Sequence, residues 1–228
     1  DILDIGGEST RPGAEPVPVE EEIRRILPVI QGIRAEESIP ISVDTYKAEV
    51  AQAALEAGAD LINDISGLNF DSHMVRVARE ARCPVVVMHI AGTPRTMQDH
   101  PWYEDVVEDI KAYFRVRLQR LEEEGIDPRN ILLDPGIGFG KRLEDNFILL
   151  KRLREFGDLN HPLLVGPSRK SFIGATLNLP VDQRVEGTLG AVCTAVWEGA
   201  RVVRVHDVRE TYRALKIVDA IRRVPDRL

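Results

Sequence analysis

The 228-residue sequence is poor in features that would place it in several common protein classes. It has only two cysteines, Cys83 and Cys193, and both lie in apolar runs (RCPVVV and AVCTAV), which is typical of small core residues rather than of a disulfide. No apolar run approaches the roughly 18 residues of a membrane helix, and nothing resembles a signal peptide. The sequence therefore predicts a cytoplasmic protein in a reducing compartment, without a membrane partner.

An excess of basic charge is also missing. Thirty Lys and Arg residues face 37 Asp and Glu residues, which gives a formal net charge of −7. A nucleic acid or an anionic membrane as the main partner would need a broad basic surface, so this balance argues against both. A small anionic ligand stays possible, because a few well-placed Arg and Lys residues suffice for it.

Short β-branched apolar runs alternate with longer stretches of helical period along the whole chain. The predicted strands are 2–5, 39–43, 60–65, 84–88, 131–133, 162–166 and 201–205. The predicted helices are 19–36, 46–58, 71–81, 103–125, 144–156, 182–199 and 208–223. This alternation indicates parallel strands covered by helices. No linker or change of composition divides the chain, so we expect residues 1–228 to form a single domain.

Seven strands would fit either an open doubly wound sheet or a (β/α)8 barrel without its first unit. A weak internal repeat favours the barrel. Residues 56–63 and 198–203 share a device in which a helix ends at Gly, and Ala and a polar residue then lead into a strand. Residues 1–5 look like the strand at 60–65 with its preceding helix end removed. We therefore expect an α/β fold, a (β/α)8 TIM barrel whose first strand and loop are missing from this chain.

Polar clusters follow the C-terminal ends of all seven predicted strands. They are GGESTRPG, DTYK, NDISG, MH, DPGIGFGK, GPSRKS and the pair Arg204 and His206. In a barrel these ends meet on one face, where such folds place their chemistry. Each cluster also has a simpler interpretation: Asp44-Thr45 fits the N-cap of a helix that starts at Tyr46, and Asp134-Pro135-Gly136 is a natural turn. GIGFGK fails the spacing of both the Walker loop and the dinucleotide fingerprint.

The residue types at this face predict a substrate with two chemically different ends. Asp44, Asn63 and Asp134 offer acceptors and one amide, which suit a flat heterocycle rich in N–H donors. The donors and cations suit a phosphate or diphosphate; they are Thr10, Arg11, Lys170, Arg204 and His206. Arg204 lies within an apolar run, so it needs a ligand or carboxylate partner. Ser171, at the start of a helix, would add backbone N–H groups for a further anion.

A metal site has little support, because the sequence has neither paired His at helical spacing nor clustered Cys. His89 is an intermediate candidate for the site. His73, His100 and His161 lie on helical or loop segments without convergent partners, so they are weaker candidates than His206.

These motifs resemble those of the dihydropteroate synthases, in the pterin-binding enzyme family. The matching stretches occur in the family's order and cover essentially the whole chain: GGESTRPG, SVDT, NDISG, MH, DPGIGFGK, GPSRKSF and RVHDV. The resemblance implies a barrel enzyme, a transferase of folate biosynthesis. It would join 6-hydroxymethyl-7,8-dihydropterin diphosphate to 4-aminobenzoate with the help of Mg²⁺, and would act as a homodimer.

The resemblance also implies a role for each matching residue. The pterin ring would be held by Asp44, Asn63, Asp134 and Lys170, with Met88 lining its pocket and Arg204 stacking on it. The diphosphate would contact Thr10, Arg11, Arg204 and His206. The aminobenzoate pocket would be shaped by Pro12, Phe139, Lys170 and Ser171. Those expected to act in catalysis are Asp44, Asp134, Lys170 and Arg204.

One departure and two alternatives accompany the resemblance. The family's first loop, which supplies a Mg²⁺-ligating Asn, has no counterpart here, so no residue is named as a metal ligand. A methyltetrahydrofolate:corrinoid methyltransferase shares the pterin-binding Asp and Asn, but it has no diphosphate to hold with TRPG, SRKS and RVH. A non-catalytic pterin-binding paralogue is the alternative outside enzymes, and the intact cationic residues argue against it.

Overall fold

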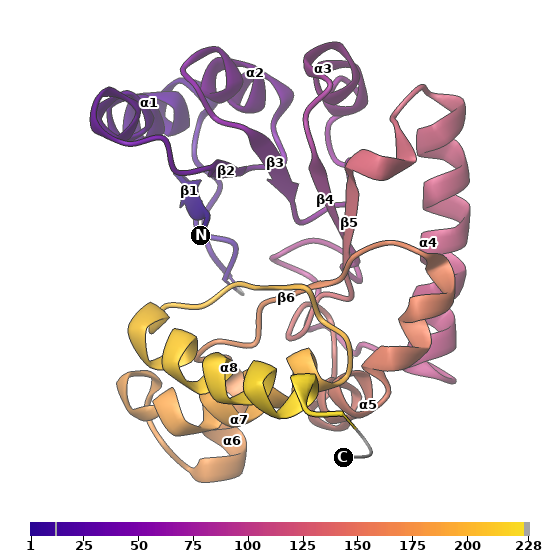
Figure 1. Cartoon of the computed structure of the whole chain (residues 1–228). Coiled ribbons are helices and arrows are strands. Elements are labelled where there is room, and N and C mark those ends of the chain that lie inside the picture. Colours follow the sequence, from indigo (N-terminus) through magenta and orange to yellow (C-terminus); the bar gives the residue numbers. More distant parts are fainter. Residues whose placement is uncertain (12, 226–228) are drawn as a thin grey trace.

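In the part of the chain that the structure describes, seven short parallel strands lie inside a layer of helices (Figure 1). The computed structural model describes residues 1–11 and 13–225. The strands are β1 (Leu3–Gly6), β2 (Ile41–Asp44), β3 (Leu61–Asp64), β4 (Val85–Met88), β5 (Ile131–Asp134), β6 (Leu164–Val165) and β7 (Val202–Val203). Every residue of β2, β3 and β4 is buried, as expected for strands covered on both faces.

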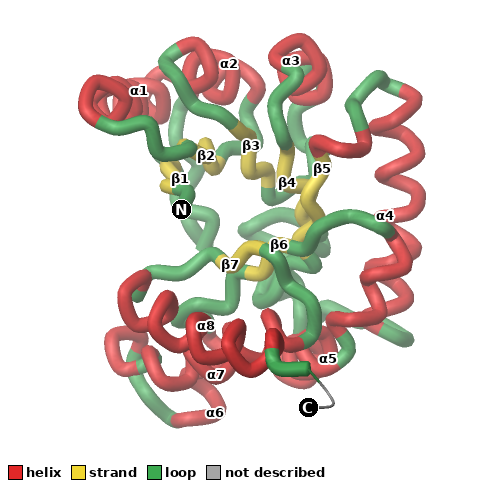
Figure 2. Tube along the Cα trace, viewed as in Figure 1, coloured by secondary structure: helices red, strands yellow, loops and turns green. Residues whose placement is uncertain are grey.

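The strands follow one another in chain order around the fold. β1 to β5 form one parallel sheet in sequential order, β6 pairs with β7, and a single parallel bridge between Leu133 and Leu163 continues β5 toward β6. This order is that of a (β/α)8 barrel and confirms the predicted fold. Within the described residues, β1 and β7 are the two edge strands and do not pair with each other. The gap between these two strands is termed here the open seam (Figure 2).

The α-helices of the described residues number eight rather than the predicted seven. They are α1 (Val19–Glu36), α2 (Ala48–Glu56), α3 (Met74–Ala81), α4 (Val106–Glu123), α5 (Leu143–Lys151), α6 (Ser171–Leu177), α7 (Val185–Trp197) and α8 (Val208–Arg223). The additional helix, α6, spans seven residues and is followed by Asn178, whose φ of +55° is left-handed. Its start at Ser171 is predicted from the sequence, but a helix of two turns carries too little periodicity for its extent to be predicted.

The core lies between the strands and the helices around them. Ile26 and Ile30 of α1 are fully buried one turn apart, and Ile110 and Phe114 of α4 repeat this i, i+4 spacing in another part of the helix layer. Phe114 also meets Phe156 edge-to-face, with their ring centroids 6.2 Å apart. These contacts fix the helices against the strands, and so they fix the positions of the loops at the strand ends.

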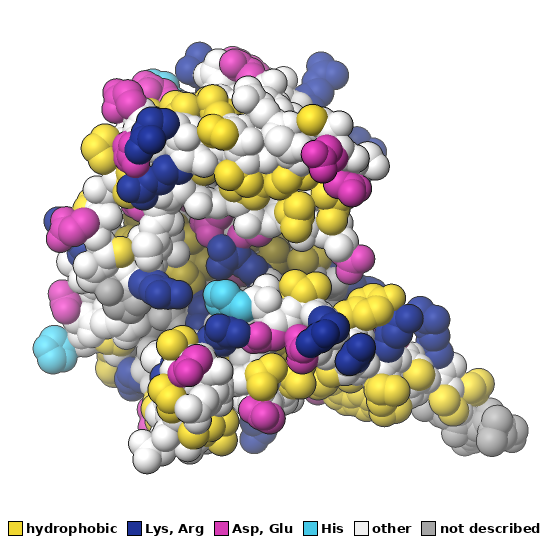
Figure 3. Space-filling view, turned by 90° about the vertical axis from the view of Figure 1, so that its left-hand side faces the viewer, with side chains coloured by type: hydrophobic (Ala, Val, Ile, Leu, Met, Phe, Trp, Pro, Cys, Tyr) yellow, Lys and Arg dark blue, Asp and Glu magenta, His cyan; other side chains and the backbone are white. Residues whose placement is uncertain are grey.

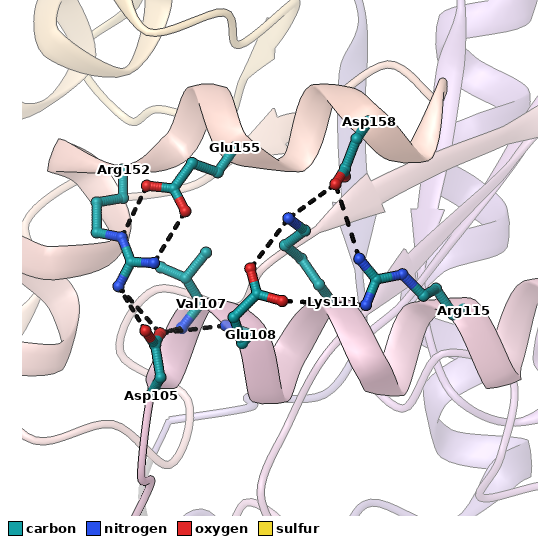
Figure 4. A network of polar contacts seen from close by, with 8 residues as sticks. All are labelled: Asp105, Val107, Glu108, Lys111, Arg115, Arg152, Glu155 and Asp158. Atoms are coloured by element: carbon teal, nitrogen blue, oxygen red, sulfur yellow. Dashed lines mark hydrogen bonds and ion pairs between the residues drawn. The ribbon is translucent and has the colours of Figure 1, made fainter.

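A network of ion pairs joins α4 to the 3₁₀ segment Leu153–Leu159 (Figure 4). Asp105 caps α4 by accepting hydrogen bonds from the backbone N–H groups of Val107 and Glu108, at 2.9 and 3.2 Å. Arg152 bridges Asp105 and Glu155 at 2.8 Å each. The network continues through Lys111 and Asp158. It lies outside the strand ends and holds the outer layer of the barrel together.

Candidate active site

Four of the predicted site residues lie at the C-terminal ends of neighbouring strands. Asp44, Met88 and Asp134 are the last residues of β2, β4 and β5, and Asn63 is the penultimate residue of β3. Asp44 is in register with Asn63, and Met88 with Asp134. All four are buried. Parallel pairing therefore brings two carboxylates, one amide and one thioether to the same end of the sheet.

Arg204, which follows β7, crosses the open seam to two of the carboxylates. Its Nη2 donates to Asp44 Oδ2 at 2.7 Å, and its Nε donates to Asp4 of β1. Asn63 Nδ2 lies 3.4 Å from both carboxylate oxygens of Asp4. The partner that the sequence required for Arg204 is thus a pair of carboxylates. The side chain is 47% exposed, so one side of the guanidinium faces solvent.

Burial sets the electrostatics of both strand-end carboxylates. It raises the pKa of Asp44 to about 7; Asp4 adds to this rise and Arg204 opposes it. The second oxygen of Asp44, Oδ1, is buried without a hydrogen-bond partner among the described residues. Burial also raises the pKa of Asp134, while Lys170 and the N–H of Gly136, 2.7 Å from Asp134 Oδ1, act against the rise.

Lys170 lies against the loop that follows β5. Its Nζ donates to the carbonyl of Ile137 and stands 4.2 Å from the centroid of the Phe139 ring, a cation–π contact. Burial lowers the pKa of Lys170 to about 8, and the charge of Asp134 opposes this change. Ser171 is the first residue of α6, as predicted, and it is exposed. Phe139 and Lys170 are thus brought together, with Ser171 beside them in the chain.

His206 stands in a strongly cationic environment. Its Nδ1 lies 2.9 Å from Ser168 Oγ, and its backbone N–H donates to the same oxygen at 3.2 Å. Burial lowers the pKa of His206, and so do the nearby charges of Arg169, Arg204 and Arg11. Figure 3 shows acidic, basic and histidine side chains gathered around a hollow on this side of the molecule.

The loop after β1 is anchored by residues that the sequence did not single out. Glu8 accepts hydrogen bonds from Tyr46 Oη and Lys47 Nζ, both at 2.5 Å, and Lys47 also meets the buried Glu22 at 2.6 Å. These contacts tie the start of the loop to α1 and to the N-terminal end of α2. Thr10 is half-buried and Arg11 exposed on this loop. Pro12 lies outside the described residues.

Asp4 is the clearest omission from the predicted site. It contacts both Arg204 and Asn63, whereas the sequence pattern at residues 2–5 predicts only an apolar strand. The signal was available, because Asp4 is a charged residue within ILDI, just as Arg204 is a charged residue within VVRV. A charge inside a strand requires a partner, and here the two charges pair with each other.

The described residues do not form a metal site of their own. No group of three or more His, Cys, Asp or Glu side chains within residues 1–11 and 13–225 could hold a metal ion. Asp4 and Asp44, two carboxylates at the strand ends, are instead engaged by Arg204. The Mg²⁺ that the resemblance implies therefore finds no protein ligand set in this part of the chain.

Comparison with known proteins gives a consistent result. The pterin-binding enzyme family matches residues 1–206. The dihydropteroate synthase of Synechocystis is 48% identical over 221 residues, which cover 96% of this chain and 76% of that protein. The structure of Yersinia pestis dihydropteroate synthase with a sulfonamide drug has a TM-score of 0.96 at 44% identity, and covers 98% of this chain and 81% of its own.

A second solved structure is the Xanthomonas albilineans dihydropteroate synthase with 4-aminobenzoic acid. It has a TM-score of 0.93 at 45% identity, with 99% of this chain and 80% of that chain covered. The similarity thus extends over nearly the whole chain in both sequence and structure.

Proposed function

The chain belongs to the pterin-binding enzyme family and has the activity of a dihydropteroate synthase, and from that premise we propose how its strand ends perform the reaction. The reaction joins 6-hydroxymethyl-7,8-dihydropterin diphosphate to 4-aminobenzoate and releases diphosphate. It is a transferase step of folate biosynthesis. The residues that carry it are assigned below from their positions and contacts.

The pterin ring binds at the ends of β2, β3 and β5. Asp44, Asn63 and Asp134 supply acceptors and an amide for a heterocycle with several N–H donors. The buried Asp44 Oδ1, which has no partner among the described residues, supports this assignment because such an atom needs a donor. Asp44 Oδ2 holds Arg204 at the same time, so a ring N–H on Oδ1 leaves that ion pair intact. Met88 gives the pocket an apolar wall.

The diphosphate binds on the cationic side of the seam. His206 follows β7 two residues after Arg204, and the charges of Arg204 and Arg11 both lower its pKa. Thr10, beside Arg11 on the loop after β1, adds a hydroxyl donor. The anionic charge of a bound diphosphate favours the protonated, donating form of His206, which the nearby guanidinium groups disfavour in the free protein.

The 4-aminobenzoate binds beside the loop that follows β5. The Phe139 ring offers an apolar face, and Lys170, held 4.2 Å above that ring, offers a cation to the carboxylate. Ser171 and Pro12 complete the proposed pocket. Lys170 also lies near Asp134, whose charge raises its pKa, so this lysine connects the aminobenzoate pocket with the pterin pocket.

The chemistry we infer is dissociative. The bond between the pterin methylene carbon and the diphosphate oxygen breaks, and its electron pair leaves with the diphosphate. Asp44 and Asp134 stabilise the positive charge that spreads into the ring, while Arg11, Arg204 and His206 stabilise the departing anion. The amine nitrogen of 4-aminobenzoate then forms the new C–N bond and loses one proton. Removal of one such preorganised group costs about 3–4 kcal/mol of transition-state stabilisation.

Three further assignments follow from the family resemblance. Mg²⁺ commonly binds through substrate phosphates with few protein ligands, so we propose that it would bind with the diphosphate. A homodimer is consistent with the exposed apolar side chains of α8, which include Tyr212 and Ile217. No helix of the described residues is long and apolar enough to cross a membrane. Both cysteines are free, which supports a cytoplasmic location.

The observation that carries the proposal is the gathering of two buried carboxylates and two cations at one end of the barrel. Asp44 is paired with Arg204, and the charges of Asp134 and Lys170 act on each other's pKa. We expect diphosphate release only when the pterin diphosphate and 4-aminobenzoate are both present, and equimolar formation of dihydropteroate. Diphosphate release at the same rate without the pterin substrate contradicts the proposal. The Lys170→Ala variant should lose affinity for both substrates while keeping the fold, and unchanged turnover removes Lys170 from the site.

A further inference from the structure

A second lysine near the site, Lys141, is buried deeply and has no assigned role. Its side chain is enclosed next to the end of β5, with the residue only 4% exposed. Lys141 Nζ lies 2.8 Å from His89 Nδ1, 3.0 Å from the Phe139 carbonyl oxygen and 3.2 Å from the His89 carbonyl oxygen. An ammonium group has three N–H donors, and these three acceptors satisfy all of them.

These contacts join two loops that follow neighbouring strands. His89 comes directly after β4, and the segment 135–141, termed here the β5 loop, follows β5. The two loops already touch closely, because a Cβ on Gly136 would lie 2.0 Å from the His89 carbonyl oxygen. Lys141 therefore closes the junction between the loops at a place where their backbones are in contact.

The β5 loop in turn supports the proposed aminobenzoate pocket. Its Ile137 carbonyl accepts the hydrogen bond from Lys170, and its Phe139 ring lies under the Lys170 ammonium. A Cβ on Gly138 would stand 2.8 Å from Lys170 Cδ, so the loop also packs along the lysine stem. A displacement of this loop moves both proposed contacts of the aminobenzoate together.

We propose that Lys141 and His89 are positioning residues for 4-aminobenzoate, which act by holding the β5 loop and so fixing Phe139 and Lys170. This inference rests on the proposed function of that pocket. Neither residue needs to touch the substrate. A shift of about 1 Å in a positioning element is enough to reduce a rate by roughly a hundredfold.

The acceptor role of His89 is constant under ordinary conditions. Burial and the neighbouring Lys141 lower the pKa of His89 to about 2, so the imidazole stays neutral. Because Nδ1 accepts from Lys141, its proton is on Nε2. The ring is further held by Tyr113, whose ring centroid is 4.9 Å away in an edge-to-face arrangement. Titration of His89 therefore does not alter the contact. Burial also lowers the pKa of Lys141 well below its usual value, while the charges of Asp134 and Asp145 oppose this change.

The β5 loop has other tethers, and one of them provides a matched control. Gln98 Nε2 donates to the Gly138 carbonyl at 3.1 Å, but Gln98 is exposed. Tyr103 Oη donates to the Gly140 carbonyl at 2.7 Å from a partly buried position. An exposed hydrogen bond exchanges readily with water, so its loss should leave the loop in place. Gln98→Ala removes a bond to the same loop without affecting the buried contact.

Two polar substitutions of His89 distinguish an acceptor at the position of Nδ1 from a polar group elsewhere in the side chain. In His89→Asn the amide oxygen can take the place of Nδ1 and accept from Lys141, whereas in His89→Gln the amide lies near the position of Nε2. Steady-state kinetics should show a KM for 4-aminobenzoate raised about tenfold in His89→Gln and changed less than about threefold in His89→Asn and Gln98→Ala. The dissociation constant of the pterin substrate should change less than about threefold in all three variants.

A double-mutant cycle tests whether His89 and Lys141 act together. Lys141→Met should raise the KM for 4-aminobenzoate as His89→Gln does, and the double variant should be no worse than either single variant. Equal KM values in His89→Asn and His89→Gln overturn the inference, and so do additive effects in the cycle. Thermal unfolding of each variant shows whether it is folded. A wild-type protein that forms no dihydropteroate refutes the proposed function itself, whereas an active wild type with insensitive variants refutes only the positioning role.

Discussion

The substitution Asp44→Asn should increase the stability of the protein and abolish most of its activity. Asn has nearly the same shape as Asp but cannot ionise. Asp44 is buried at the end of β2, with one oxygen bonded to Arg204 and the other without a partner among the described residues. A buried carboxylate of this kind favours the protonated form, so ionisation of Asp44 opposes folding.

The size of this effect follows from the pKa of Asp44, which burial raises from 3.8 to about 7. Each pKa unit corresponds to about 1.4 kcal/mol, so the ionised side chain costs about 4 kcal/mol once both states have lost the proton above about pH 7. Near pH 5 the folded protein still holds the proton that most of the unfolded chain has lost, and the cost is only about 1.5–2 kcal/mol. The cost of ionising Asp44 therefore grows as pH rises, and the free energy of unfolding falls by the same amount.

Urea unfolding at the two pH values measures the difference. Between about pH 5 and pH 8, the free energy of unfolding of the wild type should fall about 2.5 kcal/mol further than that of Asp44→Asn. The pKa of about 7 already includes the attraction of Arg204 for ionised Asp44, so no separate contribution for that bond is subtracted. Asp219→Asn, an exposed change on α8, serves as the control. Parallel pH curves for wild type and Asp44→Asn refute the reasoning.

The same variant tests the role of Asp44 in the site. If ionised Asp44 stabilises charge on the pterin ring, Asp44→Asn should lower kcat/KM by about 10²–10³-fold. Greater stability together with lost activity is the pattern of a residue retained for function. A variant that is more stable near pH 8 and fully active would keep the electrostatic argument and remove Asp44 from the catalytic assignment.

Two further predictions concern residues outside the strand ends. Glu8→Gln weakens the contact with Lys47 at the start of the loop that carries Arg11, so unfolding free energy should fall by about 1.5–3 kcal/mol and the KM for the pterin diphosphate should rise; an unchanged KM would separate this anchor from the site. Arg152→Ala disrupts the network of Figure 4, which is partly exposed, so the loss should be below about 1 kcal/mol, smaller in high salt, and without effect on turnover.

Much of the fold could be predicted because strand and helix periods are strong and regular. The helices predicted at 19–36 and 208–223 match α1 and α8 at both ends. The predicted site residues on the strands also followed from a local rule, since the last residues of parallel strands meet on one face. Asp44, Asn63 and Asp134 needed no knowledge of distant contacts to be placed there.

The pairing of residues that lie far apart along the chain could not be predicted in this way. Arg204 was expected in the site, but its partner Asp4 is 200 positions away, and Lys141 and His89 are 52 apart. Glu8 lies in the polar cluster GGESTRPG after the first strand, but its partners, Tyr46 and Lys47, come from another βα unit. Sequence spacing predicts an element, whereas buried charge pairs are determined by how elements pack.

The glycines of the β5 loop show how a local motif can have a distant cause. Their spacing suggests a phosphate-binding loop and yet fails its requirements. In the structure, Gly136 has φ of +72° and faces the His89 carbonyl at a distance that leaves no room for a Cβ, and Gly138 has φ of +80° and packs against the stem of Lys170. The glycines are thus required by close approach to the β4 end and to Lys170. A Gly138→Ala change should therefore impair 4-aminobenzoate binding for the same reason as the loss of Lys141, since both displace the loop that holds Phe139.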